Sequence, residues 1–187
     1  SVSTDKDNIL LHGIGVGAQR AGAPPAQVLT AFEQWAARSP LVAYHAAFDH
    51  YFVSADQDEI AGLDTGAGGW ARTGLAFNAI DASATSGLAN CRFFGIFGSV
   101  STHFYTINAD ECATVTADPA WTFEKYAFRA AMPAAEDCPP DRVRVVRVFN
   151  DFKGGALNHR YTTSASEAAS LAGEGWIVEG AVFCTPP

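Results

Sequence analysis

The chain of 187 residues has little positive charge: 12 lysines and arginines stand against 20 aspartates and glutamates, which gives a formal net charge of −8. Binding to a nucleic-acid backbone depends on lysine and arginine side chains that neutralise phosphates. The few basic residues are scattered singly along the sequence. The composition therefore argues against nucleic acid as a partner.

The sequence also lacks a long hydrophobic run. None of its apolar stretches approaches the roughly 18–20 residues that a membrane-spanning helix requires. Hydrophobic residues make up 48% of the chain and charged residues 17%, a composition typical of a globular domain. The first six residues are polar, so we expect any export signal to have been removed.

Three segments share a histidine followed by aromatic residues, at His50, His103 and His159. The spacings are similar, 103 − 50 = 53 and 159 − 103 = 56. A glutamate follows each histidine after eight or nine residues, a tryptophan comes later, and a phenylalanine lies seven residues beyond the tryptophan. The glutamates and tryptophans are Glu59, Glu111, Glu167, Trp70, Trp121 and Trp176. Such matched spacing predicts three copies of one repeat.

Each copy begins with an apolar run and a turn-rich link to the histidine, which favours a hairpin. An alanine- and glutamate-rich stretch then predicts a short helix, and the segment after the tryptophan predicts a closing strand. One such unit cannot bury its apolar face alone. We therefore expect an α+β domain over residues 41–187, with units at 41–80, 90–131 and 144–187 packed with pseudo-threefold symmetry. Residues 1–40 form an extension with one amphipathic helix at about residues 25–38.

This pattern, of the form "HFYT…W…EG…AF", resembles a family of bacterial repeat domains of unknown function that are found on secreted and surface proteins. The resemblance covers about residues 41–187. It implies a secreted or cell-surface location and a repeat module, but no activity.

The four cysteines fall at matching places in this frame. Cys91 and Cys112 lie on the first strand and the helix of the second copy, and Cys138 and Cys184 flank the third copy. Four cysteines permit three full pairings. Pairing within each copy, Cys91 with Cys112 and Cys138 with Cys184, predicts an oxidising, extracellular or periplasmic compartment. The alternative is four buried thiols in a reducing compartment.

A second resemblance involves the run from Leu41 to Asp49. It is similar to the "LVAHNAxFD" motif of DnaQ-like 3′–5′ exonucleases, over about residues 8–52, and implies Asp49 as a metal ligand. The first motif of that family, Asp-x-Glu, is missing, and so is its later His-and-Asp motif. Because one carboxylate cannot hold two metal ions, this resemblance points to a remnant that has lost its activity.

The repeated residues suggest two kinds of binding site. The three histidines would form a zinc or copper site if they converged, and otherwise hydrogen-bond within each unit. Aromatic side chains offer stacking surfaces for sugars, and otherwise fill the core. The candidates for sugar binding are Tyr51, Tyr105, Tyr161, Trp70, Trp121 and Trp176.

The sequence favours a non-catalytic extracellular binding or scaffold module, for glycan, cell-wall or protein surfaces. No complete catalytic apparatus is visible, and no cofactor is expected. The alternatives are an inactive exonuclease remnant using Asp49 and a structural subunit that assembles with itself. The oligomeric state is left open.

Overall fold

A computed structural model describes residues 38–45, 50–98, 100–135, 137–153 and 157–187. The expected helix at about residues 25–38 falls almost wholly outside these ranges, as does Asp49. The described part belongs to one compact unit that extends from Ala37 to Pro187.

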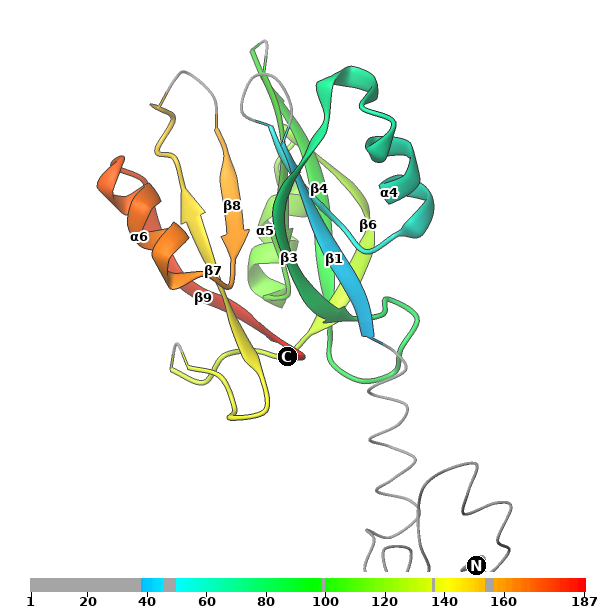
Figure 1. The fold of residues 1–187 in the computed structure, drawn as a ribbon, viewed down its shortest axis with the longest axis vertical. Helices are drawn as coiled ribbons and strands as arrows, with labels where there is room; N and C mark the ends of the chain where they lie inside the picture. The colour runs from blue at the N-terminus through cyan, green and yellow to red at the C-terminus, as the bar shows by residue number, and fades with distance from the viewer. Residues whose placement is uncertain (1–37, 46–49, 99, 136, 154–156) are drawn as a thin grey trace, which may run out of the picture. The chain divides into compact units, whose positions relative to one another are not determined.

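Three successive segments each supply two strands, a short helix and a third strand (Figure 1). The first contains β1 (Arg38–His45), β2 (Tyr51–Ser54), α4 (Gln57–Asp64), the 3-10 turn η2 (Ala67–Gly69) and β3 (Ala71–Ile80). The second contains β4 (Leu88–Phe97), β5 (Val100–Thr106), α5 (Ala109–Ala117) and β6 (Trp121–Ala130). The third contains β7 (Val143–Phe149), β8 (His159–Thr162), α6 (Ala165–Gly173) and β9 (Ile177–Thr185).

The strands form two antiparallel sheets, and the first strand of each segment lies between its other two strands. The six-stranded sheet has the order β2-β1-β3-β6-β4-β5, and the three-stranded sheet has the order β8-β7-β9. A bridge between Ala131 and Cys184 connects the end of the second segment to β9. The predicted mixture of short helices and strands is confirmed, and strands predominate among the described elements.

The three helices begin in the same way. Asp56, Asn108 and Ser164 are their N-caps, and each side chain accepts hydrogen bonds from backbone N–H groups of the first turn. Such caps satisfy donors that have no partner within the helix. A glutamate follows three residues after each cap, where the helix dipole favours a negative charge.

All three segments contribute to one central hydrophobic cluster. Three fully buried tyrosines in it bond across segment boundaries. Tyr51 donates to the carbonyl of Tyr161 (2.8 Å), and Tyr161 in turn donates to the carbonyl of Tyr105 (2.9 Å). Tyr105 completes the cycle by donating to the carbonyl of Val53 (2.8 Å). Each segment is thus hydrogen-bonded to the other two through a core hydroxyl or a backbone carbonyl.

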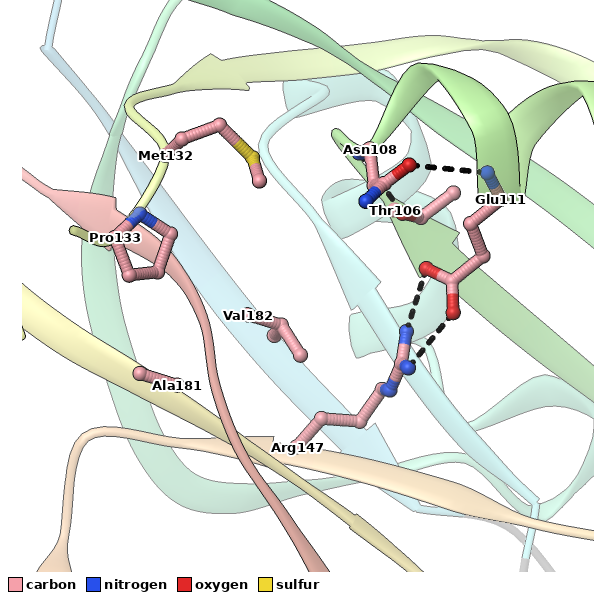
Figure 2. A pocket seen from close by; sticks show the side chains of 8 residues that line it. All are labelled: Thr106, Asn108, Glu111, Met132, Pro133, Arg147, Ala181 and Val182. Atoms are coloured by element: carbon pink, nitrogen blue, oxygen red, sulfur yellow. Dashed lines mark hydrogen bonds and ion pairs between the residues drawn. The ribbon is translucent and has the colours of Figure 1, made fainter. Parts of the chain in front are cut away.

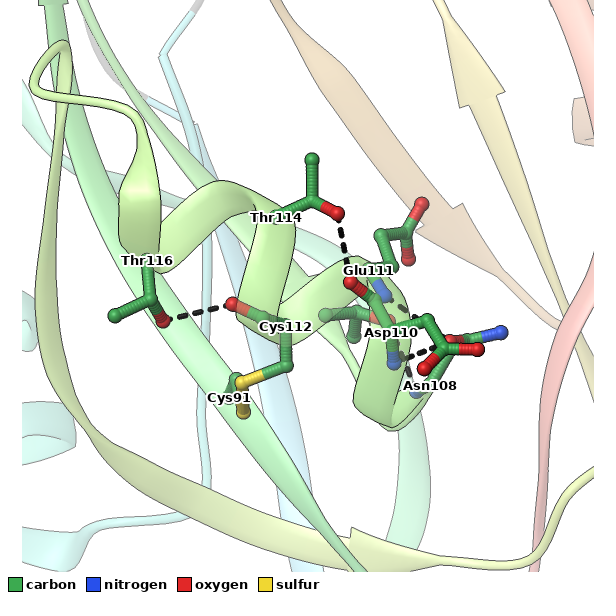
Figure 3. Close-up of a disulfide and its surroundings, with 8 residues drawn as sticks. Cys91, Asn108, Asp110, Glu111, Cys112, Thr114 and Thr116 are labelled. Carbon is green, nitrogen blue, oxygen red and sulfur yellow. Dashed lines mark hydrogen bonds between the residues drawn. A yellow bond between two sulfur atoms is a disulfide. The ribbon is translucent and has the colours of Figure 1, made fainter.

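Both disulfides that the sequence suggested are present. Cys91 of β4 is bonded to Cys112 of α5, which fixes the helix against its sheet (Figure 3). Cys138 is bonded to Cys184 of β9, so the link after the second segment is held to the last strand. None of the described helices is long and apolar enough to cross a membrane.

Candidate functional site: two grooves between successive segments

Two buried arginines connect successive segments. Arg92 of β4 donates to both carboxylate oxygens of Glu59 on α4 (2.8 Å each), and its Nε donates to Glu124 of β6 (2.7 Å). Arg147 of β7 repeats the arrangement. It donates to both oxygens of Glu111 on α5 (3.0 and 2.8 Å), and its Nε donates to Glu179 of β9 (2.7 Å).

These arginines keep the surrounding carboxylates ionised. Burial opposes ionisation of Glu59, but hydrogen bonds from Arg92, Lys125 and Ser54 outweigh it and lower the Glu59 pKa to about 2. Burial likewise opposes ionisation of Glu111 and Glu124, but hydrogen bonds, chiefly from Arg147 to Glu111 and from His103 to Glu124, lower their pKa values. A general acid must hold its proton near the working pH. None of these three carboxylates is therefore suited to protonate a leaving group.

The boundary between the third and first segments is built differently. Ala43 pairs with Val53 in the place where Arg92 pairs with Tyr105 and Arg147 with Tyr161. Glu167 matches Glu59 and Glu111 in its distance from the helix cap. One of its carboxylate oxygens is buried and has no hydrogen-bond partner among the described residues. The arginine–glutamate arrangement is thus present at two of the three boundaries.

A groove lies at each of these two boundaries, beside the helix cap and against the third strand of the following segment. The first groove, about 380 Å³, is lined by Ala55, Asp56, Gln57, Asp81, Ala82, Lys125, Tyr126 and Ala127. The second groove, about 240 Å³, is lined by Thr106, Asn108, Glu111, Met132, Pro133, Arg147, Ala181 and Val182 (Figure 2).

The two grooves differ at two neighbouring positions, on β6 in the first groove and on β9 in the second. Lys125 pairs with Arg92, whereas Gly180 pairs with Arg147. In the first groove Lys125 forms ion pairs with Asp56 (2.8 Å) and Glu59 (2.7 Å), and the Tyr126 side chain stands 58% exposed. In the second groove Gly180 and Ala181 take these places, so the groove reaches Arg147 itself.

The aromatic candidates from the sequence divide into two groups. Tyr51, Tyr105 and Tyr161 are fully buried. Their rings therefore present no face to solvent, which corrects their interpretation as sugar platforms and places them in the core. The three tryptophans are partly buried against the outer clusters beside the helices, and the Arg160 guanidinium lies 4.9 Å from the Trp176 ring. None of the three lines either groove.

The histidines do not share one position. His103 and His159 each lie five residues before a helix cap (108 − 103 and 164 − 159), and in the first segment that place belongs to Tyr51 (56 − 51). His50 therefore lies one residue before the position that His103 and His159 occupy in their segments. His50 Nε2 lies 2.7 Å from His103 Nδ1.

His159 has surroundings like those of His103. Its ring packs on Phe149 and Phe104, as that of His103 packs on Phe94 and Phe52. Within the described ranges, no three histidine, cysteine, aspartate or glutamate side chains are placed to hold a metal ion.

We expect His159→Phe to make the free energy of unfolding depend less on pH below about 6.5. Burial, and then the charge of Arg147, lower the His159 pKa from 6.5 to about 3. The folded state therefore binds fewer protons than the unfolded state, and stability is lost as the pH falls from 6.5 towards 3. Phenylalanine preserves the ring stacking and removes this titration. Urea denaturation at pH 8, 6.5 and 4.5 should show the variant losing about 2–3 kcal/mol less than the wild type between pH 6.5 and 4.5. Parallel curves for the two proteins would contradict this assignment.

Comparison with protein families matches residues 41–185 to a domain of unknown function, DUF5648. The chain belongs to this family. The DUF5648 region begins on β1 and ends on β9, so it contains all three segments and both grooves. The prediction that residues 41–187 belong to a domain family of unknown function is confirmed. Neither curated proteins nor solved structures give a match to the chain.

The sequence pattern pointed to Glu111 of the second groove, but it gave no role to the two arginines beside the grooves. Arg92 and Arg147 were not singled out, although each is a charged residue inside a hydrophobic strand. A buried charge requires a partner, so each arginine marked a position where another segment must approach. Lys125 and Tyr126 carried no comparable signal, because their role depends on the register between β4 and β6.

Proposed function

We propose that the DUF5648 domain is a non-catalytic binding module that acts outside the cytoplasm and recognises glycans of cell walls or cell surfaces. In this proposal its three strand–strand–helix–strand units are copies of one repeat, arranged with pseudo-threefold symmetry. The observation that carries the proposal is the lining of the first groove, which combines the exposed residue Tyr126 with several hydrogen-bonding residues.

The chemistry of the first groove suits a sugar. A pyranose ring has an apolar face that stacks on an aromatic side chain, and hydroxyl groups that bond to polar groups around it. Tyr126 supplies the aromatic surface, and its ring lies 5.3 Å from that of Phe123. The carboxylates of Asp56 and Asp81 and the amide of Gln57 supply polar partners.

Two further features support this proposal. Two disulfides in a small domain are typical of an oxidising compartment. The net charge of −8 favours neutral or amino sugars over acidic polysaccharides. The ionised state of Glu59, Glu111 and Glu124 supports binding without hydrolysis, because glycosidases need one protonated carboxyl group.

The test is binding to insoluble polysaccharides and soluble oligosaccharides, measured by pull-down and titration calorimetry. We expect Tyr126→Ala to weaken binding by tenfold or more, because it removes the stacking surface. Phe152→Ala is the matched control, since Phe152 is a similarly exposed aromatic residue (56%) outside both grooves. Absence of binding across the panel, or equal binding by Tyr126→Ala and the control, would overturn the proposal.

A further inference from the structure

The second groove offers a chemical environment that the first groove does not. Gly180 has a positive φ of 91°, a conformation that favours glycine, so this position stays without a side chain. Together with Ala181 it leaves the groove open down to the Arg147–Glu111 ion pair (Figure 2). We propose that the second groove binds the acetamido group of an N-acetylated amino sugar. This inference rests on the proposed function and names its substrate class.

The groove contains hydrogen-bond donors without acceptors. Arg147 is 7% exposed and lines the groove, and its three hydrogen bonds to Glu111 and Glu179 use three of its five N–H groups. The Oδ1 atom of Asn108 accepts from the N–H groups of Asp110 (2.9 Å) and Glu111 (3.1 Å). No described residue accepts from its Nδ2 group. Both side chains can therefore donate to a ligand carbonyl.

The local charge selects a neutral acceptor over an anion. Glu111 and Glu179 place two carboxylates around the single guanidinium of Arg147. A ligand carboxylate would meet a site that is already net negative, whereas an amide carbonyl accepts the same hydrogen bonds without repulsion.

The opposite wall and the size of the groove fit an acetyl methyl group. Met132, Pro133 and Val182 supply apolar surface across from the donors (Figure 2). The volume of about 240 Å³ is small for a whole oligosaccharide, since pockets for drug-sized ligands start at roughly 300 Å³. The groove thus suits one substituent of a sugar rather than an extended chain.

The first groove provides the design for a conservative variant. Its cap residue is Asp56, which accepts from the N–H groups of Asp58 and Glu59 just as Asn108 accepts from those of Asp110 and Glu111. Asn108→Asp therefore preserves the helix cap and removes only the amide donors. Ala181→Tyr is a second variant, which places a bulky side chain at a residue that lines the second groove.

The experiment compares N-acetylglucosamine, glucosamine and glucose by calorimetry and by the shift of the Asn108 side-chain amide resonance in the isotope-labelled protein. We expect at least tenfold tighter binding of N-acetylglucosamine, a shift of the Asn108 amide signal with that sugar alone, and loss of the preference in Asn108→Asp and Ala181→Tyr. Phe152→Ala should retain the preference. Thermal unfolding of each variant checks that it is folded.

The outcomes separate this inference from the proposed function. Equal affinity for N-acetylglucosamine and glucose, or a preference that survives in both variants, overturns the acetamido site and leaves the first groove as the binding site. Acetate carries a negative charge, so tight binding of acetate at the Asn108 amide would overturn the claim that the groove prefers a neutral group. Failure of every sugar and polysaccharide to bind overturns both proposals.

Discussion

Replacing Arg147 with methionine is expected to lower the free energy of unfolding by roughly 2–4 kcal/mol, because the change removes a buried cation from two partly exposed carboxylates. The Arg147 guanidinium satisfies Glu111 from the preceding segment and Glu179 from its own segment. It also lies 4.7 Å from the Phe104 ring centre, so its loss removes packing as well as charge. Urea denaturation at pH 7 measures the effect.

Arg72→Met is the matched control. Arg72 forms an ion pair with Asp64, but the two side chains are 51% and 38% exposed. Exposed pairs contribute about 0–1 kcal/mol, because water and salt screen them. A triple variant, Arg147→Met with Glu111→Gln and Glu179→Gln, should recover part of the loss because it removes the unpaired charges. Equal costs for Arg147→Met and Arg72→Met would contradict the structural role assigned to Arg147.

Loss of the two disulfides is the second large effect. The chain-entropy relation gives about 3 kcal/mol for Cys91–Cys112, which are 21 residues apart, and about 4 kcal/mol for Cys138–Cys184, which are 46 residues apart. Their sum, about 7 kcal/mol, is comparable to the whole stability of a typical domain, 5–15 kcal/mol. We therefore expect reduction to leave the domain largely unfolded at 37 °C.

Paired alanine variants separate the two bonds. Cys138→Ala with Cys184→Ala should cost more than Cys91→Ala with Cys112→Ala, because it opens the longer loop. Both pairs are measured by chemical denaturation without reductant, and the wild type with reductant gives the combined effect. The opposite ranking would show that loop length does not control the contribution of these bonds.

The local parts of the fold were predictable from the sequence because they depend on neighbouring residues. The alanine- and glutamate-rich stretches predicted the three short helices, and the places of the four cysteines suggested the two pairings that the structure contains. Alternating apolar residues predicted the third strand of each segment.

The grooves were not predictable from the sequence because they depend on register between distant strands. A shift of one residue turns a side chain to the other face of a sheet. Matching His50 with His103 and His159 by sequence introduces such a shift, because Tyr51 is the residue that takes their place in the first segment. The contrast between Lys125 and Gly180 likewise has meaning only once each is paired with its arginine.

The hydrogen bonds of the core tyrosine hydroxyls also make the three segments depend on one another. An open stack of repeats has two ends, so evolution can lengthen or shorten it one unit at a time. Here the bonds run from Tyr51 to Tyr161, from Tyr161 to Tyr105 and from Tyr105 to Val53. They therefore start and end in the first segment. Deleting one segment removes both a donor and an acceptor from the core, and adding a fourth has no open partner to join. The three segments therefore form one hydrogen-bonded unit rather than an extendable stack.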